Sequence, residues 1–212
     1  LGNTYINIAN NNIDDIGTLK KQQDGQNLTL SIDSKLQYIA YRELSKAVEK
    51  HKAKAGAIVM LDAKTGEVLA LANVPTYNPN SNVGIDPNNR RNRVLTDTYE
   101  PGSTMKPFAA AIAIQSGKFK PTTVVNVNGG SIRFGSAVIH DTHSHGSLTV
   151  EQIIQVSSNV GAVKLALSFK PEEYWTFLDS VGFGRRTDSG FPGEVRGILR
   201  PWKKWVPVDQ AT

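Results

Sequence analysis

Two short apolar runs on either side of a polar turn constrain the fold of this chain most strongly. Residues 57–61 and 68–72 are continuously apolar, and Asp62, Lys64 and Gly66 lie between them. Two strands joined by a glycine-bearing turn form a β-hairpin. Because neither run alternates apolar with polar residues, we expect this hairpin to be covered on both faces, inside a central sheet.

An amphipathic helix is predicted just before this hairpin. Residues 28–32 alternate apolar and polar side chains, as a half-buried strand does. Ser34 and Gln37 then have the spacing of a capping box, and apolar residues recur at helical intervals to about His51. The expected apolar face comprises Leu36, Ala40, Leu44, Ala47 and Val48, and the expected solvent-facing residues are Lys35, Arg42, Glu43 and Glu49.

A second helix is predicted to begin near residue 103. Residues 105–115 are almost entirely apolar, which indicates a helix that is buried on nearly every side. Pro107 is compatible with a helix only in the first turn, where its missing N–H would have no partner in any case. We therefore expect this helix to begin close to Ser103.

Short strands and two more helices are predicted in the second half of the chain. Thr149 and Gln152 form a capping box before a short apolar helix, and Pro171 and Gly182 begin and end another. Helices and strands mixed without βαβ regularity indicate an α+β fold, with an antiparallel sheet packed between helices. The expected strands are residues 123–127, 131–134 and 137–139, and the expected loops are residues 73–102 and 183–212.

The composition excludes several classes of protein. No run of about 18 apolar residues occurs, so no segment of the chain is expected to span a bilayer. The absence of cysteine excludes thiol catalysis, Cys-ligated zinc and iron–sulfur sites. The net charge of +5 comes from scattered lysines and arginines without interleaved aromatic residues, so no nucleic-acid partner is indicated.

The strongest candidate for chemistry is the pair Ser103 and Lys106. Side chains three residues apart on a helix lie one turn apart on the same face. A serine at a helix N-terminus lies beside free N–H groups, which favour the oxyanion that forms when it attacks a carbonyl. A lysine on an apolar helix loses its proton more easily and can then act as a base toward the serine. The alternative is an N-cap serine beside a surface lysine.

A second polar cluster, Ser157-Ser158-Asn159, interrupts an otherwise apolar segment. These residues are either the polar caps of a helix end or a loop that projects into a cleft. In a cleft, Ser157 could relay a proton. Asn159 could bind a substrate amide through both its donor and its acceptor groups.

Together the two clusters resemble the motifs of the serine penicillin-binding proteins and their β-lactamase relatives. The residues around them resemble a class B penicillin-binding protein, and most of all the cell-division transpeptidases of Gram-negative bacteria. The resemblance covers residues 28–212 almost without interruption. The segments that carry it are Leu28–Tyr41, Tyr99–Phe108, Asp141–His143, Ser157–Gly161, Gly182–Gly184 and Pro192–Glu194.

The resemblance implies D,D-transpeptidation of peptidoglycan stem peptides during septal cell-wall synthesis. Ser103 would attack the D-Ala-D-Ala carbonyl, release the terminal D-Ala and pass the acyl group to an amine on a neighbouring strand. Lys106 would be the base, Ser157 would pass protons to the leaving amine, and Asn159 would position the donor peptide. β-Lactams would acylate Ser103 in place of the substrate. The resemblance implies no cofactor and no metal.

The resemblance also implies a domain organisation and a location. Residues 28–212 would be part of the transpeptidase (penicillin-binding) domain, and residues 1–27 a linker or a remnant of the N-terminal non-catalytic region. Proteins of this family have a single inner-membrane anchor, which this chain does not include, and a catalytic domain in the periplasm. Other membrane proteins of cell division would be partners.

One family motif does not occur at its usual place. The family carries Lys-Thr/Ser-Gly on a strand after the serine-serine-asparagine segment, and no such sequence follows Asn159 here. Lys64-Thr65-Gly66 precedes Ser103, and the predicted hairpin turn explains it without catalysis. We therefore expect a C-terminally incomplete transpeptidase domain, without its later sheet strands and C-terminal helix. As an isolated 212-residue chain it should acylate poorly.

Other functions share part of the pattern. His140, His143 and His145 could hold a metal, although the pocket context of a catalytic metal site is missing. A non-crosslinking β-lactam sensor or an elongation-type transpeptidase of the same fold would share Ser103 and Lys106. A β-lactamase and a purely structural cell-division scaffold are further alternatives. Turnover of a D-Ala-D-Ala peptide and the lifetime of the acyl group separate these functions.

Overall fold

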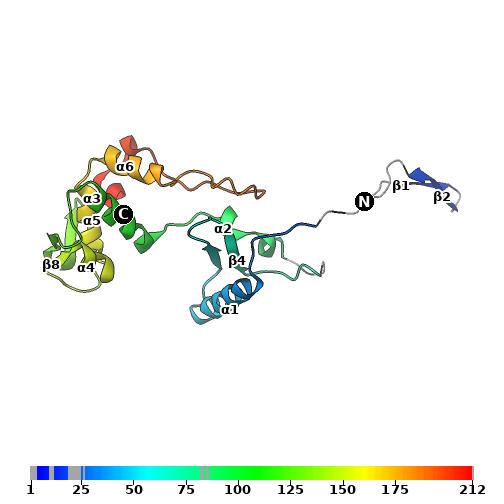
Figure 1. Cartoon of the computed structure of the whole chain (residues 1–212), viewed down its shortest axis with the longest axis horizontal. Coiled ribbons are helices and arrows are strands. Elements are labelled where there is room, and N and C mark those ends of the chain that lie inside the picture. Colours follow the sequence, from blue (N-terminus) through cyan, green and yellow to red (C-terminus); the bar gives the residue numbers. More distant parts are fainter. Residues whose placement is uncertain are drawn as a thin grey trace. The chain divides into compact units, whose positions relative to one another are not determined.

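The computed structural model describes residues 4–9, 12–18, 25, 27–81, 84 and 86–211. The chain divides into two compact units, residues 1–76 and residues 77–212 (Figure 1). Each unit has its own cluster of buried hydrophobic residues. The two units are therefore described one after the other.

The first unit begins with a β-hairpin. β1 (Thr4–Ala9) pairs antiparallel with β2 (Asn12–Thr18), and Ala9 lies opposite Asn12 beside the turn. Asp14 and Asp15, which usually favour turns, lie inside β2. Their presence explains why the residue pattern alone does not predict this strand.

α1 (Ser34–Lys50) confirms the predicted first helix, but its cap lies one residue earlier than expected. The Asp33 carboxylate accepts hydrogen bonds from two backbone N–H groups of the first turn, at 2.8 and 2.9 Å, so Asp33 and not Ser34 caps the helix. Gln37 has another role. Its side-chain amide bonds both the N–H and the carbonyl of Leu71, at 2.7 and 2.8 Å, and so fixes α1 to the following hairpin.

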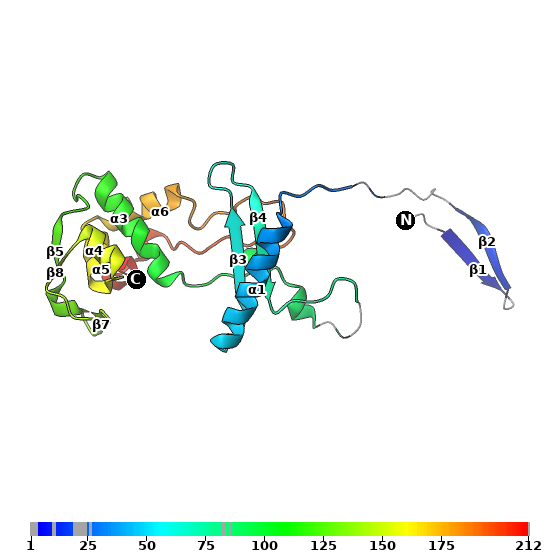
Figure 2. The ribbon, with the colours of Figure 1, turned by 60° about the horizontal axis from the view of Figure 1, so that its bottom comes forward.

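That hairpin consists of β3 (Gly56–Leu61) and β4 (Val68–Val74), as predicted. α1 lies across one face of it (Figure 2), and the contact buries Ala40, Leu44, Ala70 and Ala72. The expected cover on both faces is wrong, because Val59 and Leu61 are 46% and 56% exposed. Within the described residues, β3 and β4 form a two-stranded sheet and not part of a larger central one.

Residues 28–32 do not form the predicted strand. Leu28 and Leu30 are exposed. The segment meets the start of β4 through the Ser31 hydroxyl, which donates to the Val68 carbonyl at 2.7 Å. An alternating segment becomes a strand only where a neighbouring strand completes its ladder, and none of the described strands pairs with it.

The second unit contains most of the helices. The buried helix is present as α3 (Lys106–Gln115) after a 3-10 turn, η2 (Gly102–Met105), so helical backbone begins beside Ser103 as predicted. The expected loops contain short helical turns, two of which begin at Pro87 and Pro207. None of the helices in the described part of the chain is long and apolar enough to cross a membrane. The other helical elements are η1 (Pro87–Arg90), α2 (Arg93–Thr96), η3 (Asn128–Gly130), α4 (Val150–Gln155), α5 (Asn159–Leu167), α6 (Pro171–Ser180), η4 (Trp202–Lys204) and α7 (Pro207–Ala211).

The strands of the second unit form two antiparallel pairs. The three predicted strands are confirmed, and the α+β class is confirmed with them. The antiparallel pairing is divided among four separate two-stranded sheets in the described part of the chain. The pairs are β5 (Val124–Asn126) with β8 (Ser147–Thr149) and β6 (Ser131–Phe134) with β7 (Ala137–His140).

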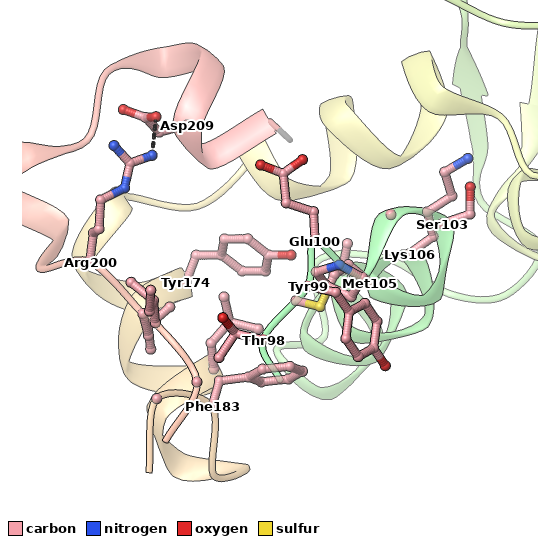
Figure 3. A pocket seen from close by; sticks show the side chains of 18 of the residues that line it. Thr98, Tyr99, Glu100, Ser103, Met105, Lys106, Tyr174, Phe183, Arg200 and Asp209 are labelled. Carbon is pink, nitrogen blue, oxygen red and sulfur yellow. Dashed lines mark hydrogen bonds and ion pairs between the residues drawn. The ribbon is translucent and has the colours of Figure 1, made fainter. Parts of the chain in front are cut away.

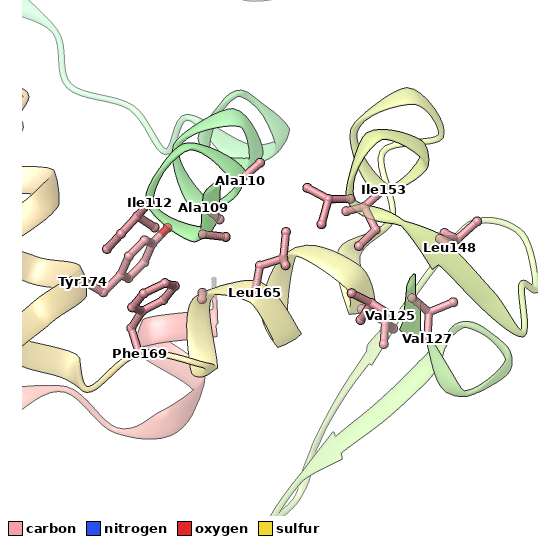
Figure 4. Close-up of a cluster of buried hydrophobic side chains, with 14 of the residues drawn as sticks. Ala109, Ala110, Ile112, Val125, Val127, Leu148, Ile153, Leu165, Phe169 and Tyr174 are labelled. Carbon is pink, nitrogen blue, oxygen red and sulfur yellow. The ribbon is translucent and has the colours of Figure 1, made fainter. Parts of the chain in front are cut away.

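α3, α4 and α5 pack around one hydrophobic core (Figure 4). Ile153 of α4 and Leu165 of α5 are fully buried there. Tyr174 of α6 extends the core, and burial raises the pKa of its hydroxyl to about 12. Because α3 and α5 share this core, the residues at the beginnings of the two helices have fixed positions relative to one another.

Gly161 allows α5 to approach α4 closely. A Cβ atom at this position would lie 2.5 Å from Cγ1 of Ile153. We predict that Gly161→Ala destabilises the fold by about 1–3 kcal/mol through overpacking, although alanine favours helix. Gly146→Ala is the control, because a Cβ atom there meets nothing within 4 Å, and it should change stability by less than about 0.5 kcal/mol. Equal stability of both variants in urea unfolding would contradict the close approach.

Candidate active site

Ser103 lies where the 3-10 turn η2 continues into α3. Gly102, directly before it, has a φ of +59°, a left-handed conformation that glycine adopts without strain. The backbone N–H of Lys106 donates to the Ser103 carbonyl and closes the turn. Because the two residues are three apart on helical backbone, their side chains project in the same direction, as Figure 3 shows.

Lys106 connects the two polar clusters of the sequence. Its Nζ atom donates to the backbone carbonyl of Ser157 at 2.6 Å and to the Ser157 hydroxyl oxygen at 2.8 Å. The two residues are 51 positions apart in the sequence. The structure therefore brings Ser157 to the same place as the serine–lysine pair, through the packing of α3 against α4 and α5.

The surroundings of Lys106 favour its neutral amine. Partial burial lowers the pKa of Lys106 below its ordinary value, because the charged form loses hydration there. The negative charge of Asp141 acts in the opposite direction and raises the pKa of Lys106. Burial is the larger of the two effects, so this amine loses its proton more readily than a lysine in water.

Ser157 has an unusual backbone conformation at the end of α4. Its φ is +56°, in the left-handed region where glycine normally ends a helix. The N–H groups of Ser157 and Ser158 donate to the carbonyls of Ile154 and Ile153, at 3.2 and 2.9 Å, in the pattern of a Schellman motif. A serine in this region is strained, and such strain is commonly retained where a side chain must be aimed.

Ser158 and Asp141 hold the second cluster in place, and sequence reasoning assigned neither of them a role. The Ser158 side chain is buried and caps α5 by accepting from the N–H of Gly161 at 2.9 Å. Its hydroxyl donates to Asp141 at 2.7 Å, and the second carboxylate oxygen accepts from the N–H of Val160 at 2.9 Å. The sequence did mark the position of Asp141, because this residue belongs to a segment that carries the family resemblance.

Asn159 is fixed by the end of β7. Its side-chain nitrogen donates to the backbone carbonyl of His140 at 2.7 Å. This bond uses one of the two N–H donors of the amide. The expected role in binding a substrate amide through donor and acceptor is therefore compatible with this position.

A cavity of about 1060 Å³ lies within the second unit. Ser103, Lys106 and Asn159 line it, so three of the four predicted site residues share one cavity. Figure 3 shows Tyr174 and Phe183 at the same cavity, away from the serine and the lysine. Ser157 is not a lining residue and contacts the site through Lys106.

Two other sequence features have structural explanations. Lys64-Thr65-Gly66 forms the turn between β3 and β4, as predicted, and the Asp62 carboxylate accepts from the N–H groups of Lys64 and Thr65. In the described part of the chain, no group of three histidine or acidic side chains is placed to hold a metal ion.

Residues 56–212 match the Transpeptidase family, described as the penicillin binding protein transpeptidase domain. PenA of Neisseria flavescens, named a probable peptidoglycan D,D-transpeptidase, is 50% identical over 190 residues, which are 90% of this chain and 47% of the relative. The peptidoglycan D,D-transpeptidase FtsI of Escherichia coli K12 is 40% identical over 200 residues, which are 94% of this chain and 34% of the relative. The chain thus spans about a third to a half of the length of these relatives.

Two solved structures have a similar fold. The transpeptidase domain of Burkholderia pseudomallei penicillin-binding protein 3 has a TM-score of 0.75 and 47% identity, and the match covers 86% of this chain and 51% of that one. A structure described as a peptidoglycan glycosyltransferase from Burkholderia ambifaria has a TM-score of 0.76 and 49% identity, with 87% and 54% covered. By the family match over most of its length, this chain belongs to the penicillin-binding protein transpeptidase domain family.

Proposed function

We propose that the protein containing this chain is a serine-type peptidoglycan D,D-transpeptidase. The observation that carries the proposal is the contact of the Lys106 amine with the carbonyl and hydroxyl of Ser157, beside a serine on the same helical face. A base, a nucleophile and a second hydroxyl then lie within one small region. The names of the relatives support the same reaction.

In the proposed first step, the Ser103 hydroxyl oxygen attacks the carbonyl carbon of the penultimate D-Ala of a stem peptide. Its proton passes to the neutral amine of Lys106, and the C–N bond to the terminal D-Ala breaks. A neutral amine has two N–H groups and one lone pair. If the two N–H groups are directed at the carbonyl and the hydroxyl of Ser157, the lone pair is left for the Ser103 proton.

The leaving amine must gain a proton in the same step. We propose that it comes from the ammonium of Lys106 through the hydroxyl of Ser157, which lies 2.8 Å from Nζ. The products are a Ser103 ester and free D-Ala. An amine of a neighbouring stem peptide then attacks the ester, and Ser103 regains its proton as the crosslink forms.

Asn159 is proposed to bind the donor peptide, because it lines the cavity with the nucleophile and keeps amide groups for a ligand. β-Lactams present a strained amide carbonyl to the same serine and are proposed to acylate it. The ester should be lost slowly, which distinguishes a transpeptidase from a β-lactamase.

The cellular setting is proposed from the same family. The resemblance of the sequence motifs to cell-division transpeptidases supports a septal role, with other membrane proteins of cell division as partners. We propose that residues 28–212 are part of a periplasmic catalytic domain, that residues 1–27 belong to the region before it, and that a membrane anchor elsewhere in the full-length protein holds it to the inner membrane.

Ser103→Ala should abolish covalent attachment of a penicillin to the full-length protein, because it removes the proposed nucleophile, whereas the Ser157 hydroxyl, which also contacts Lys106, does not line the cavity. Intact-mass spectrometry measures the adduct. Ser136→Ala, which removes a hydroxyl from the turn between β6 and β7, is the control and should leave the adduct unchanged. An adduct of undiminished yield on Ser103→Ala would contradict the proposed nucleophile.

The rate of acylation should rise with pH through the lowered pKa of Lys106. The neutral amine is the proposed base, so its protonation below that pKa should slow acylation. The pH–rate profile should therefore fall on its acid side, here called the acid limb. Lys106→Arg keeps a cation that cannot be deprotonated, and it should lower the rate by about 10²–10⁴-fold and remove the limb. Stopped-flow acylation across pH measures both effects. An acid limb that persists in Lys106→Arg would assign the titration to another group.

Asp141→Asn removes the charge that opposes the effect of burial on Lys106. The pKa of Lys106 should then fall further, so the acid limb should move to lower pH. Asparagine offers one acceptor oxygen where two are used, so the bond from either Ser158 or Val160 should be lost, which should also slow acylation at every pH. Glu151→Gln, at the other end of α4, is the control and should leave the limb in place. A limb that stays in place or moves to higher pH in Asp141→Asn would refute the electrostatic role.

A further inference from the structure

One buried carboxylate closes the loop formed by residues 187–194, here called the Glu194 loop. The Glu194 residue is 8% exposed, and its two carboxylate oxygens accept four hydrogen bonds. One oxygen accepts from the N–H and the hydroxyl of Thr187, at 2.6 and 2.8 Å. The other accepts from the N–H and the hydroxyl of Ser189, at 3.1 and 2.7 Å. Both ends of the loop are thus held by a single side chain.

These bonds keep the carboxylate ionised. All four donors stabilise the negative charge and lower the pKa of Glu194 to about 2. The loop closure should therefore be complete above the ordinary glutamate pKa, near 4.5, and be lost only as the pH falls toward about 2.

The residue after the loop is tied to the segment that leads to Ser103. The N–H of Val195 donates to the carbonyl of Leu95 at 2.9 Å. Leu95 belongs to α2 and precedes Ser103 by eight residues. At Gly193 the loop backbone also approaches the Thr96 side chain, which lies 3.9 Å from where a Cβ atom would be.

The α2 end of this connection is itself held firmly. Asp97 accepts from Arg93 at 3.0 Å and from the Thr96 hydroxyl at 2.9 Å. The backbone N–H groups of Thr96 and Asp97 bond carbonyls one turn earlier, at 3.0 and 3.1 Å. A displacement of the Glu194 loop should therefore move residues 95–97 together, because their hydrogen bonds hold them as one rigid turn.

The loop and the nucleophile also line the same cavity. Thr187, Glu194 and Val195 contribute to one part of its lining, and residues 98–103 to another. Leu95 is also a lining residue, so the bond from Val195 to Leu95 joins two residues of the cavity wall.

We propose that Glu194 is a positioning residue for the acylation of Ser103, because it holds the loop that fixes the start of the nucleophile segment, residues 95–103. The inference rests on the proposed function, in which Ser103 is the nucleophile. Glu194 touches neither the substrate nor the reacting atoms in this account. It acts through Val195 and Leu95.

A carboxylate is required because four donors meet at this one side chain. Glutamine has the same shape but replaces one acceptor oxygen with an NH₂ group. That group would face the N–H of either Thr187 or Ser189, so two donors would oppose one another. Glu194→Gln should therefore open the loop without changing its bulk.

The test compares Glu194→Gln with the unchanged full-length protein in two measurements. Hydrogen–deuterium exchange of the amides of residues 95–103 should become at least tenfold faster, although these residues are distant from position 194 in the sequence. Acylation by a fluorescent penicillin should slow by about 10- to 100-fold, because misplaced reacting groups lose the benefit of orientation. The midpoint of the acid limb should not move, since Lys106 is untouched.

Asp188→Asn is the matched control, because it removes an exposed carboxylate from the same loop at a left-handed position that asparagine tolerates well. It should leave exchange and acylation within twofold of the unchanged protein. Ser189→Ala removes one of the four bonds to the carboxylate, together with the 3.3 Å bond that the same hydroxyl accepts from the N–H of Phe191, and should have a smaller effect in the same direction as Glu194→Gln. If Glu194→Gln fails to fold, the exchange and acylation of Ser189→Ala test the positioning role instead.

The possible outcomes separate this inference from the proposed function. Unchanged exchange at residues 95–103, or faster exchange with unchanged acylation, overturns the positioning role. Faster exchange together with slower acylation supports it. If Ser103→Ala is still acylated, the proposed function fails. The exchange measurement then still tests whether the Glu194 loop holds residues 95–103.

Discussion

The contact between the Lys106 amine and Ser157 determines what this domain can do. It joins the start of α3 to the junction of α4 and α5, and it places a partly dehydrated amine beside a serine. Neither half of the site contains the proposed base, the proposed nucleophile and the proposed proton relay by itself. The proposed chemistry therefore depends on the core that fixes α3 against α5.

The positions around this contact are set mainly by backbone groups. Gly102 turns the chain before Ser103, a left-handed Ser157 ends α4, and a buried Ser158 begins α5. Asp141, directly after β7, accepts from that serine and from the backbone N–H of Val160, so it also holds the junction. Residues without a proposed chemical role, Gly102, Ser158 and Asp141, thus support the proposed site residues, as precise catalytic geometry requires.

The sequence predicted the parts of this fold that depend on local patterns. The helix at Ser103 followed from Pro107, and the second capping box was confirmed in atomic detail. The wrong predictions concern residues whose structure depends on contacts far away in the sequence. Residues 28–32 alternate but pair with none of the described strands. The Gln37 side chain bonds β4 instead of capping α1. In the site, motif spacing predicts roles for Ser103, Lys106, Ser157 and Asn159. The family resemblance includes the segment of Asp141, but its contact with Ser158 could not be predicted, because only the tertiary fold brings that carboxylate to Ser158.

The central claim is that Ser103 is the nucleophile and that Lys106, held by Ser157, is its base. A crystal structure of the full-length protein after reaction with a β-lactam tests it most directly. We expect an ester at the Ser103 hydroxyl oxygen, with the Lys106 amine still in hydrogen-bond contact with Ser157 and directed at the ester. An adduct on another residue, or a lysine turned away from both serines, would contradict it.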